Sequence, residues 1–120
     1  MNTTNHRSIT SLSRAAAILL TLGLFTIGSI PNIGHAFPGI LHWIAHIAAY
    51  ALIAYAFGLG WPQWPALLIV ASVAAIGAIH EVTEIITHSH ALEAEDAIVN
   101  TIGVVIGVAI QRITQRTIIQ

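Results

Sequence analysis

The sequence has no cysteine and no lysine among its 120 residues. Without cysteine the chain has no disulfide, no thiolate nucleophile and no cysteine-ligated metal. Charge of either sign is also scarce, because charged residues make up 8% of the chain, against about 25% in an average soluble domain. The net charge is −1, so the chain lacks the basic surface that nucleic-acid binding requires. We therefore exclude a nucleic-acid partner and do not expect a compact water-soluble domain.

Hydrophobic residues, in contrast, make up 56% of the sequence. They form four apolar stretches, which cover residues 15–30, 39–59, 65–87 and 96–110. A helix of about 20 residues crosses a hydrocarbon core of about 30 Å, and helices satisfy their own backbone hydrogen bonds in lipid. The sequence therefore predicts an all-α integral membrane protein, a four-span transmembrane helix bundle. Its expected partners include the membrane lipids around it.

The basic residues predict how the bundle is oriented. All of them lie near the two ends of the chain, as Arg7, Arg14, Arg112 and Arg116. Four spans place both termini on one side of the membrane, and the positive-inside rule predicts that this side is the cytoplasm. We expect a polar cytoplasmic N-terminal tail at 1–14, a membrane domain at 15–112 and a cytoplasmic C-terminal tail at 113–120.

An alternative interpretation concerns the first stretch. Residues 1–36 also resemble a secretory signal, with an arginine-bearing start, an apolar core and a small-x-small sequence at Gly34-His35-Ala36. Cleavage there would leave three spans and reverse the location of the new N-terminus. The sequence leaves this alternative open.

Ionisable residues lie inside the apolar stretches, where a charge at a helix centre costs roughly 2.5 kcal/mol or more. Polar residues spaced four apart share one helix face. They form three such stripes: His42, His46 and Tyr50, then His80, Glu84 and His88 with Glu81 one position round the helix, then Asp96 and Asn100. Counted at about 1.5 Å per residue, the stripes lie at matching depths from the same end of the bundle. We expect them to meet in a polar pocket between the second, third and fourth spans, in the outer third of the bilayer.

Imidazole and carboxylate groups gathered in an apolar setting suit acid–base chemistry. The leading acid–base pair is His46 and Glu81. We predict the catalytic residues to be His46, Glu81, Glu84 and Tyr50, and the ligand-binding residues to be Asp96, Asn100 and His42. A purely structural hydrogen-bond network is the alternative, so whether the protein is an enzyme stays open.

The same donors also suit a divalent metal such as zinc, manganese or iron. The predicted ligands are His46, His80, Glu81 and Glu84, although Glu84 replaces the second histidine of the His-Glu-x-x-His pattern. Proton handling by this cluster is a related option. A b-type haem between His46 and His80 and a structural, holin-like homo-oligomer are further alternatives.

Three motifs, in this order, resemble the VanZ-like family of small membrane proteins, which is named after an accessory teicoplanin-resistance protein. They are His46-Ile-Ala-Ala-Tyr50, then His80-Glu81-Val-Thr-Glu84, then Asp96-x-x-x-Asn100-x-x-Gly103-x-x-x-Gly107. The likeness covers about residues 30–110. The chain departs from the family pattern at His80 in place of Asp, Glu84 in place of Gln, and His42-Trp43 in place of Asp-Lys.

The resemblance implies a role at the bacterial cell envelope, in the cytoplasmic (inner) membrane. The implied roles are protection against glycopeptide antibiotics or the handling of lipid-linked envelope components, with a lipid-linked molecule or a glycopeptide as ligand. The motif positions matched in full are His46, Tyr50, Glu81, Asp96 and Asn100, which also belong to the three stripes. The additional histidines of this chain favour a metal.

Overall fold

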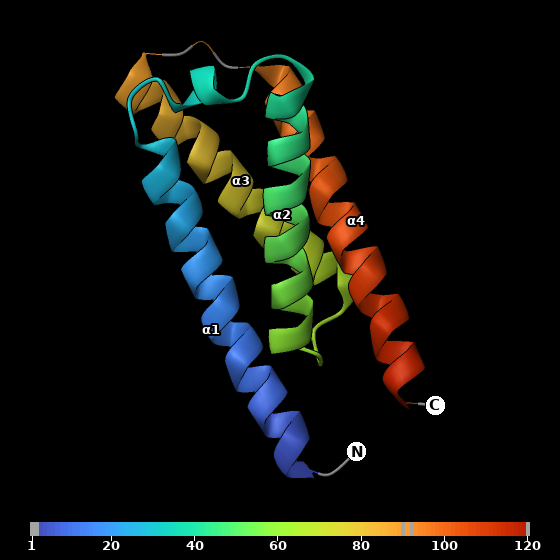
Figure 1. Ribbon diagram of the computed structural model, residues 1–120. Helices are drawn as coiled ribbons and strands as arrows, with labels where there is room; N and C mark the ends of the chain where they lie inside the picture. Colours follow the sequence, from blue (N-terminus) through green and yellow to red (C-terminus); the bar gives the residue numbers. More distant parts are fainter. Residues whose placement is uncertain (1–2, 90, 92, 120) are drawn as a thin grey trace.

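The structure, a computed structural model, describes residues 3–89, 91 and 93–119. Within these residues it contains four α-helices, one short 3-10 helix and no strand (Figure 1). The elements are α1 (Thr3–Gly28), η1 (Ile33–Ala36), α2 (Ile40–Gly60), α3 (Ala66–His88) and α4 (Ala94–Ile119). The predicted all-α, four-helix fold is confirmed.

Each α-helix is long and apolar enough to cross a membrane. The candidate spans are Asn5–Gly28, Ile40–Gly60, Ala66–His88 and Ala94–Thr117. Large apolar side chains point outward from them; Leu67 is 79% exposed and Ile86 is 76% exposed. Such surfaces are costly in water and suit contact with lipid tails. The chain is an integral membrane protein.

The first and last helices are longer than the apolar stretches that predicted them. Helix α1 begins at Thr3 and α4 continues to Ile119, so both segments expected as polar tails are helical where described. Neither segment contains a proline or glycine to end the helix. Hydroxyl side chains also return their hydrogen bonds to the helix; Thr10 Oγ1 donates to the His6 carbonyl oxygen at 3.0 Å.

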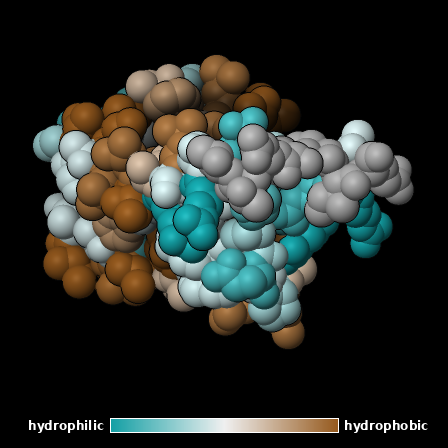
Figure 2. Space-filling view, turned by 90° about the horizontal axis from the view of Figure 1, so that it is seen from below, coloured by the Kyte–Doolittle hydropathy of each residue, from teal (hydrophilic) through white to brown (hydrophobic). Residues whose placement is uncertain are grey.

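The helices alternate in direction. Both termini and the turn between α2 and α3 lie at one end, and the α1–α2 and α3–α4 connections lie at the other (Figure 1). Figure 2 views the end that holds the termini, where hydrophilic side chains gather and hydrophobic ones form much of the surrounding rim. We refer to this end as the arginine end, since Arg7, Arg14, Arg112 and Arg116 belong to it, and to the other as the histidine end.

Two arginines hold the arginine end together. Arg14 Nε donates to the Gly60 carbonyl oxygen at 2.7 Å, and its guanidinium lies 5.4 Å from the centre of the Trp61 ring. Arg112 Nη2 donates to the Trp64 carbonyl oxygen at 2.6 Å. These bonds satisfy carbonyl groups at the end of α2 and in the following turn, and they tie α1 and α4 to that turn.

Helix α4 packs closely on α2 through two glycines. A Cβ at Gly103 would lie 2.5 Å from the Ile47 carbonyl oxygen, and one at Gly107 would collide with the Ala51 carbonyl oxygen. Glycines four residues apart allow two helix backbones to approach in this way. This backbone contact fixes the rotation of α4 relative to α2, and therefore which side chains of α4 face the histidines of α2.

Candidate functional site

Polar side chains from α2, α3 and α4 meet at the histidine end. His42 Nε2 lies 3.2 Å from Asp96 Oδ1, and one turn further along both helices His46 Nδ1 lies 2.7 Å from Asn100 Oδ1. Asn100 Nδ2 in turn donates to Glu81 Oε1 at 3.1 Å. The three sequence stripes are thus brought together, and Asn100 is the residue on which they converge.

The direction of these hydrogen bonds determines which nitrogen of His46 carries a proton. The amide nitrogen of Asn100 donates to Glu81, so its amide oxygen faces His46. An amide oxygen only accepts, and therefore His46 Nδ1 is the donor. Nε2 is then the nitrogen whose lone pair is available when the ring is neutral.

The predicted acid–base pair, His46 and Glu81, is not in direct contact, because Asn100 lies between the two side chains. A carboxamide does not carry protons at neutral pH, so this bridge positions the two groups and does not join them into a proton-sharing pair. Glu81 is buried, with 7% of the residue exposed. It orients Asn100, which orients His46.

His80 and Glu84 lie beside this bridge. His80 is 3% exposed, and its Nε2 lies 3.8 Å from Glu84 Oε1. Neither ring nitrogen of His80 makes a hydrogen bond to another described residue. The end of α1 makes room for the ring, because a Cβ at Gly28 would collide with His80 Nε2.

Tyr50 lies next to the site, because the centre of its ring is 6.4 Å from that of His46 and 6.5 Å from that of His80. It is fully buried in the core with Ile53, Ile69 and Val104. Its hydroxyl has no hydrogen-bond partner in the part of the chain that the structure describes. Gly77 gives the ring its space, since a Cβ there would lie 3.1 Å from Tyr50 Cε1. The ring thus belongs to the core and also borders the site histidines, and its catalytic role stays a prediction.

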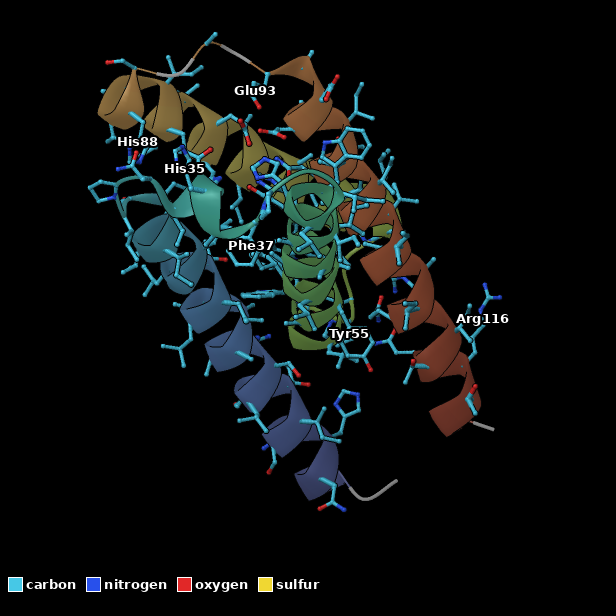
Figure 3. All side chains as sticks on the ribbon, turned by 45° about the horizontal axis from the view of Figure 1, so that its top comes forward. His35, Phe37, Tyr55, His88, Glu93 and Arg116 are labelled. Carbon is cyan, nitrogen blue, oxygen red and sulfur yellow. The ribbon has the colours of Figure 1, made fainter. Side chains whose placement is uncertain are left out.

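A cavity of about 1030 Å³ opens next to these residues. Its walls are α1, the loop that contains η1, α2 and the facing ends of α3 and α4. The ionisable residues lining it are His35, His42, His46, His80, Glu84, His88, Glu93 and Asp96. Further toward the arginine end the lining is apolar, with Leu19, Leu20, Gly23, Ala49, Leu52 and Ile53. Figure 3 shows His35, His88 and Glu93 at the histidine end, remote from Arg116.

At its histidine end the cavity borders α2, α3 and α4, the three spans between which the sequence predicted a pocket, but it extends away from them along α1. Close packing at Gly103 and Gly107 fills the space between α2 and α4. Helix α1 instead forms one wall, through small and apolar residues that carry no sequence signal of a site. His88 closes the histidine end by a 2.8 Å bond from its Nε2 to the Gly28 carbonyl oxygen.

The predicted metal ligands divide between two groups of donors. One consists of His42, His46 and Asp96, and the other of His80, Glu81 and Glu84. Within each group, one donor atom per residue lies within 4.8 Å of the others. The structure therefore places His46 with His42 and Asp96, and not with the three α3 residues.

Comparisons with models of protein families, with curated proteins and with solved structures gave no match. The resemblance to VanZ-like proteins is thus carried by the three motifs alone. Any function proposed for this chain must therefore be argued from the residues and the cavity of the site.

Proposed function

We propose that the protein binds a lipid-linked component of the cell envelope in the cavity. The polar group of this molecule would lie among the imidazoles and carboxylates of the histidine end. Its hydrocarbon chain would lie between α1 and α2. His46, with the lone pair of Nε2 available, is the leading acid–base group of this proposal, and Glu81 acts through Asn100 to hold it.

The observation that carries the proposal is the division of one cavity into a polar end and an apolar part. Ligand pockets usually measure about 300–1,000 Å³ and contain a few convergent polar groups in an apolar lining. This cavity, of about 1030 Å³, is large enough for such a ligand. An amphipathic molecule aligned with the helices would match both parts of the lining, whereas a small polar solute would leave the apolar part unused.

The polar residues also indicate the class of head group. Among the described residues lining the cavity, none is lysine or arginine, and three are carboxylic acids: Glu84, Glu93 and Asp96. Carboxylates accept hydrogen bonds, and neutral imidazole both donates and accepts. This set favours hydroxyl and amide groups, as in a saccharide or peptide head group. Such head groups agree with the envelope role that the VanZ-like motifs imply.

A photo-crosslinking experiment tests this proposal. The probe is a single-chain lipid with a saccharide head group and a diazirine in its alkyl chain, added to the protein in nanodiscs. We expect labelling of α1 within residues 16–27 and of α2 within residues 45–53. A probe of equal chain length with a phosphocholine head group should label these segments less.

A pair of variants distinguishes the cavity from the lipid-facing surface. Gly23 lines the cavity, and a Cβ at this position would have nothing within 4 Å, so Gly23→Phe should fill the apolar part and reduce labelling. Leu22→Phe is the control, because Leu22 is 59% exposed and does not line the cavity. Equal labelling of both variants and of the wild type would contradict binding in the cavity.

The proposed biological setting is protection against glycopeptide antibiotics. Expression in a sensitive bacterial strain should raise the teicoplanin concentration that stops growth, and His46→Ala should remove this effect. His6→Ala is the matched control, because His6 lies at the arginine end. If the wild-type protein does not change susceptibility to teicoplanin, the proposed role in resistance is wrong. Binding of a lipid-linked molecule is tested separately by the crosslinking experiment.

A further inference from the structure

We propose that His42, His46 and Asp96 form a binding site for a divalent transition-metal ion, zinc or an ion of similar ligand preference. This ligand set differs from the four residues that the sequence predicted, and a bound ion would take the Nε2 lone pair of His46 in place of a proton. It does not depend on a lipid-linked ligand, because the three side chains meet through the packing of α2 against α4.

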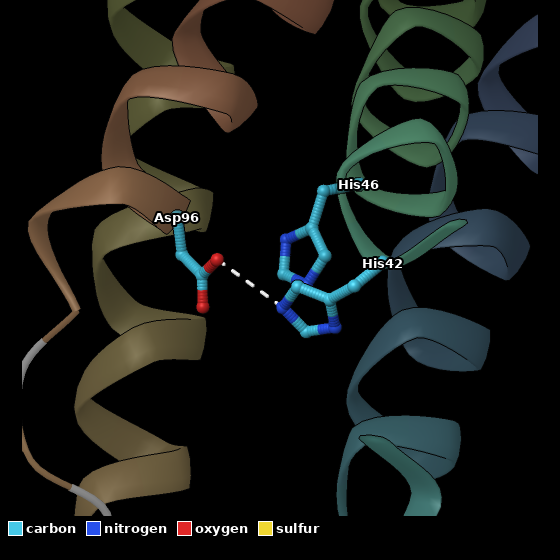
Figure 4. A group of neighbouring side chains, drawn as sticks. All are labelled: His42, His46 and Asp96. Carbon is cyan, nitrogen blue, oxygen red and sulfur yellow. Dashed lines mark hydrogen bonds and ion pairs between the residues drawn. The ribbon is translucent and has the colours of Figure 1, made fainter. Parts of the chain in front are cut away.

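The geometry of the three donors suits such an ion. Figure 4 shows the imidazoles of His42 and His46 projecting from successive turns of α2 toward Asp96 on α4. His42 Nε2 and Asp96 Oδ1 are 3.2 Å apart, and the donors of all three residues lie within 4.8 Å of one another. Ligands about 2.0–2.1 Å from a tetrahedral zinc ion are about 3.3 Å apart. The His42–Asp96 pair already has a spacing close to that of two zinc ligands, and His46 lies near enough to supply the third.

The surroundings of His46 are also those of a metal ligand. Histidines that bind metals usually donate their other ring N–H to an oxygen acceptor, which fixes the tautomer and the ring orientation. His46 Nδ1 donates to Asn100 Oδ1 at 2.7 Å, and Asn100 is itself held by Glu81. Because Nδ1 is engaged in this way, Nε2 is the nitrogen of His46 that would bind the ion.

Charge and access support the same assignment. Asp96 is 5% exposed, and a buried carboxylate needs a compensating charge or hydrogen bonds. Glu84 and Glu93 also line the cavity, and Lys and Arg are lacking among its described lining residues, so a cation is favoured there. His42, His46 and Asp96 all face the cavity. Three protein ligands with a further position open to a cavity are typical of zinc sites that bind other molecules.

The second donor group, His80, Glu81 and Glu84, is a weaker candidate. All three of its residues come from α3, so a single helix would have to place every ligand. Glu81 Oε1 is already engaged by Asn100. Substitutions in this second group are therefore compared with those in the first group in the binding experiment. The remaining alternative is that His42 and Asp96 only form a hydrogen bond that ties α2 to α4.

The test is a titration with Co²⁺ and competition by Zn²⁺. Full-length protein without a histidine tag is treated with a chelator in detergent, and Co²⁺ binding is followed by its visible absorption. We expect one ion per chain. His42→Ala and Asp96→Asn should each weaken binding at least about tenfold, and Asn100→Leu should weaken it about 10–100-fold by releasing His46. His6→Ala should bind as the wild type does.

Helical content by circular dichroism and the elution volume of each variant show whether it has folded. If a ligand variant does not fold, His42→Gln supplies the same test with less change in volume. Absence of Co²⁺ binding to the wild type, or unchanged affinity in folded His42→Ala and Asp96→Asn, would overturn the proposal. Loss of binding in Glu84→Gln but not in Asp96→Asn would also overturn it and assign the ion to the α3 group. Since no lipid probe is present, this result is independent of the crosslinking experiment.

Discussion

At the scale of single residues, Asn100 organises the site. Its amide both donates and accepts in fixed directions, and it uses both functions, toward Glu81 and toward His46. A carboxylate at this position would repel Glu81, and an apolar residue would leave both neighbours without this hydrogen bond. Asn100 therefore explains how a buried glutamate and a histidine on different helices are held together.

Asn100→Leu should lower stability by about 1–3 kcal/mol, because it leaves the buried acceptor Glu81 and the half-buried donor His46 without this partner. Glu81→Gln should cost less, since the amide oxygen of glutamine still accepts from Asn100. Reversible unfolding in mixed micelles measures both changes. A smaller loss for Asn100→Leu than for Glu81→Gln would mean that the bridge does not hold these helices together.

At the scale of elements, the α2–α4 contact determines where the site forms. Gly103 and Gly107 bring the two backbones together, and the pairs His42–Asp96 and His46–Asn100 follow along the same contact toward the histidine end. Helix α1 packs mainly on α2 and shares only a small contact with α3. The cavity lies on this less tightly packed side of α2.

Gly107→Ala should destabilise the protein by about 1–3 kcal/mol, because the added methyl group meets the Ala51 carbonyl oxygen in a close-packed contact. Gly23→Ala is the matched control on α1, where the added Cβ has nothing within 4 Å. It should be neutral or stabilising by about 0.4–1 kcal/mol. Equal unfolding free energies for the two variants would contradict the close approach of α2 and α4.

At the scale of the whole molecule, the two ends differ in chemistry. The arginine end carries both termini and the α2–α3 turn, whereas the histidine end carries the candidate site and the two other connections (Figure 1). By the positive-inside rule we expect the arginine end to lie on the cytoplasmic side. In that orientation the polar end of the cavity faces the outer side of the membrane, as the proposed binding of a lipid-linked molecule requires.

The lack of natural cysteine makes this orientation directly measurable. In intact cells, a membrane-impermeant maleimide should label His35→Cys and Ala91→Cys, and should label Asn5→Cys and Gln63→Cys only after the cells are opened. All four positions are exposed in the structure. The opposite pattern would place the arginine end outside, and labelling of Asn5→Cys and Gln63→Cys from different sides would contradict the four-span arrangement.

The sequence by itself determined the four helices, their apolar outer faces and the three polar stripes at matching depth. These features are local, because hydropathy and the helical repeat are properties of one segment at a time. The extension of α1 and α4 beyond the apolar stretches was missed, since a polar segment without glycine or proline can continue a helix outside the apolar part.

Only the tertiary structure decided which polar residues are partners and where the cavity lies. Three features depend on how the helices are rotated against one another: the place of Asn100 between His46 and Glu81, the grouping of His42 with Asp96, and the burial of Tyr50. The wall formed by α1 was not predictable, because its glycine, alanine and leucine residues are the same types that face lipid. The rotation and the crossing angle of two helices are set by how their side chains pack together. This packing joins segments far apart in the sequence, so it cannot be predicted from the periodicity of one helix.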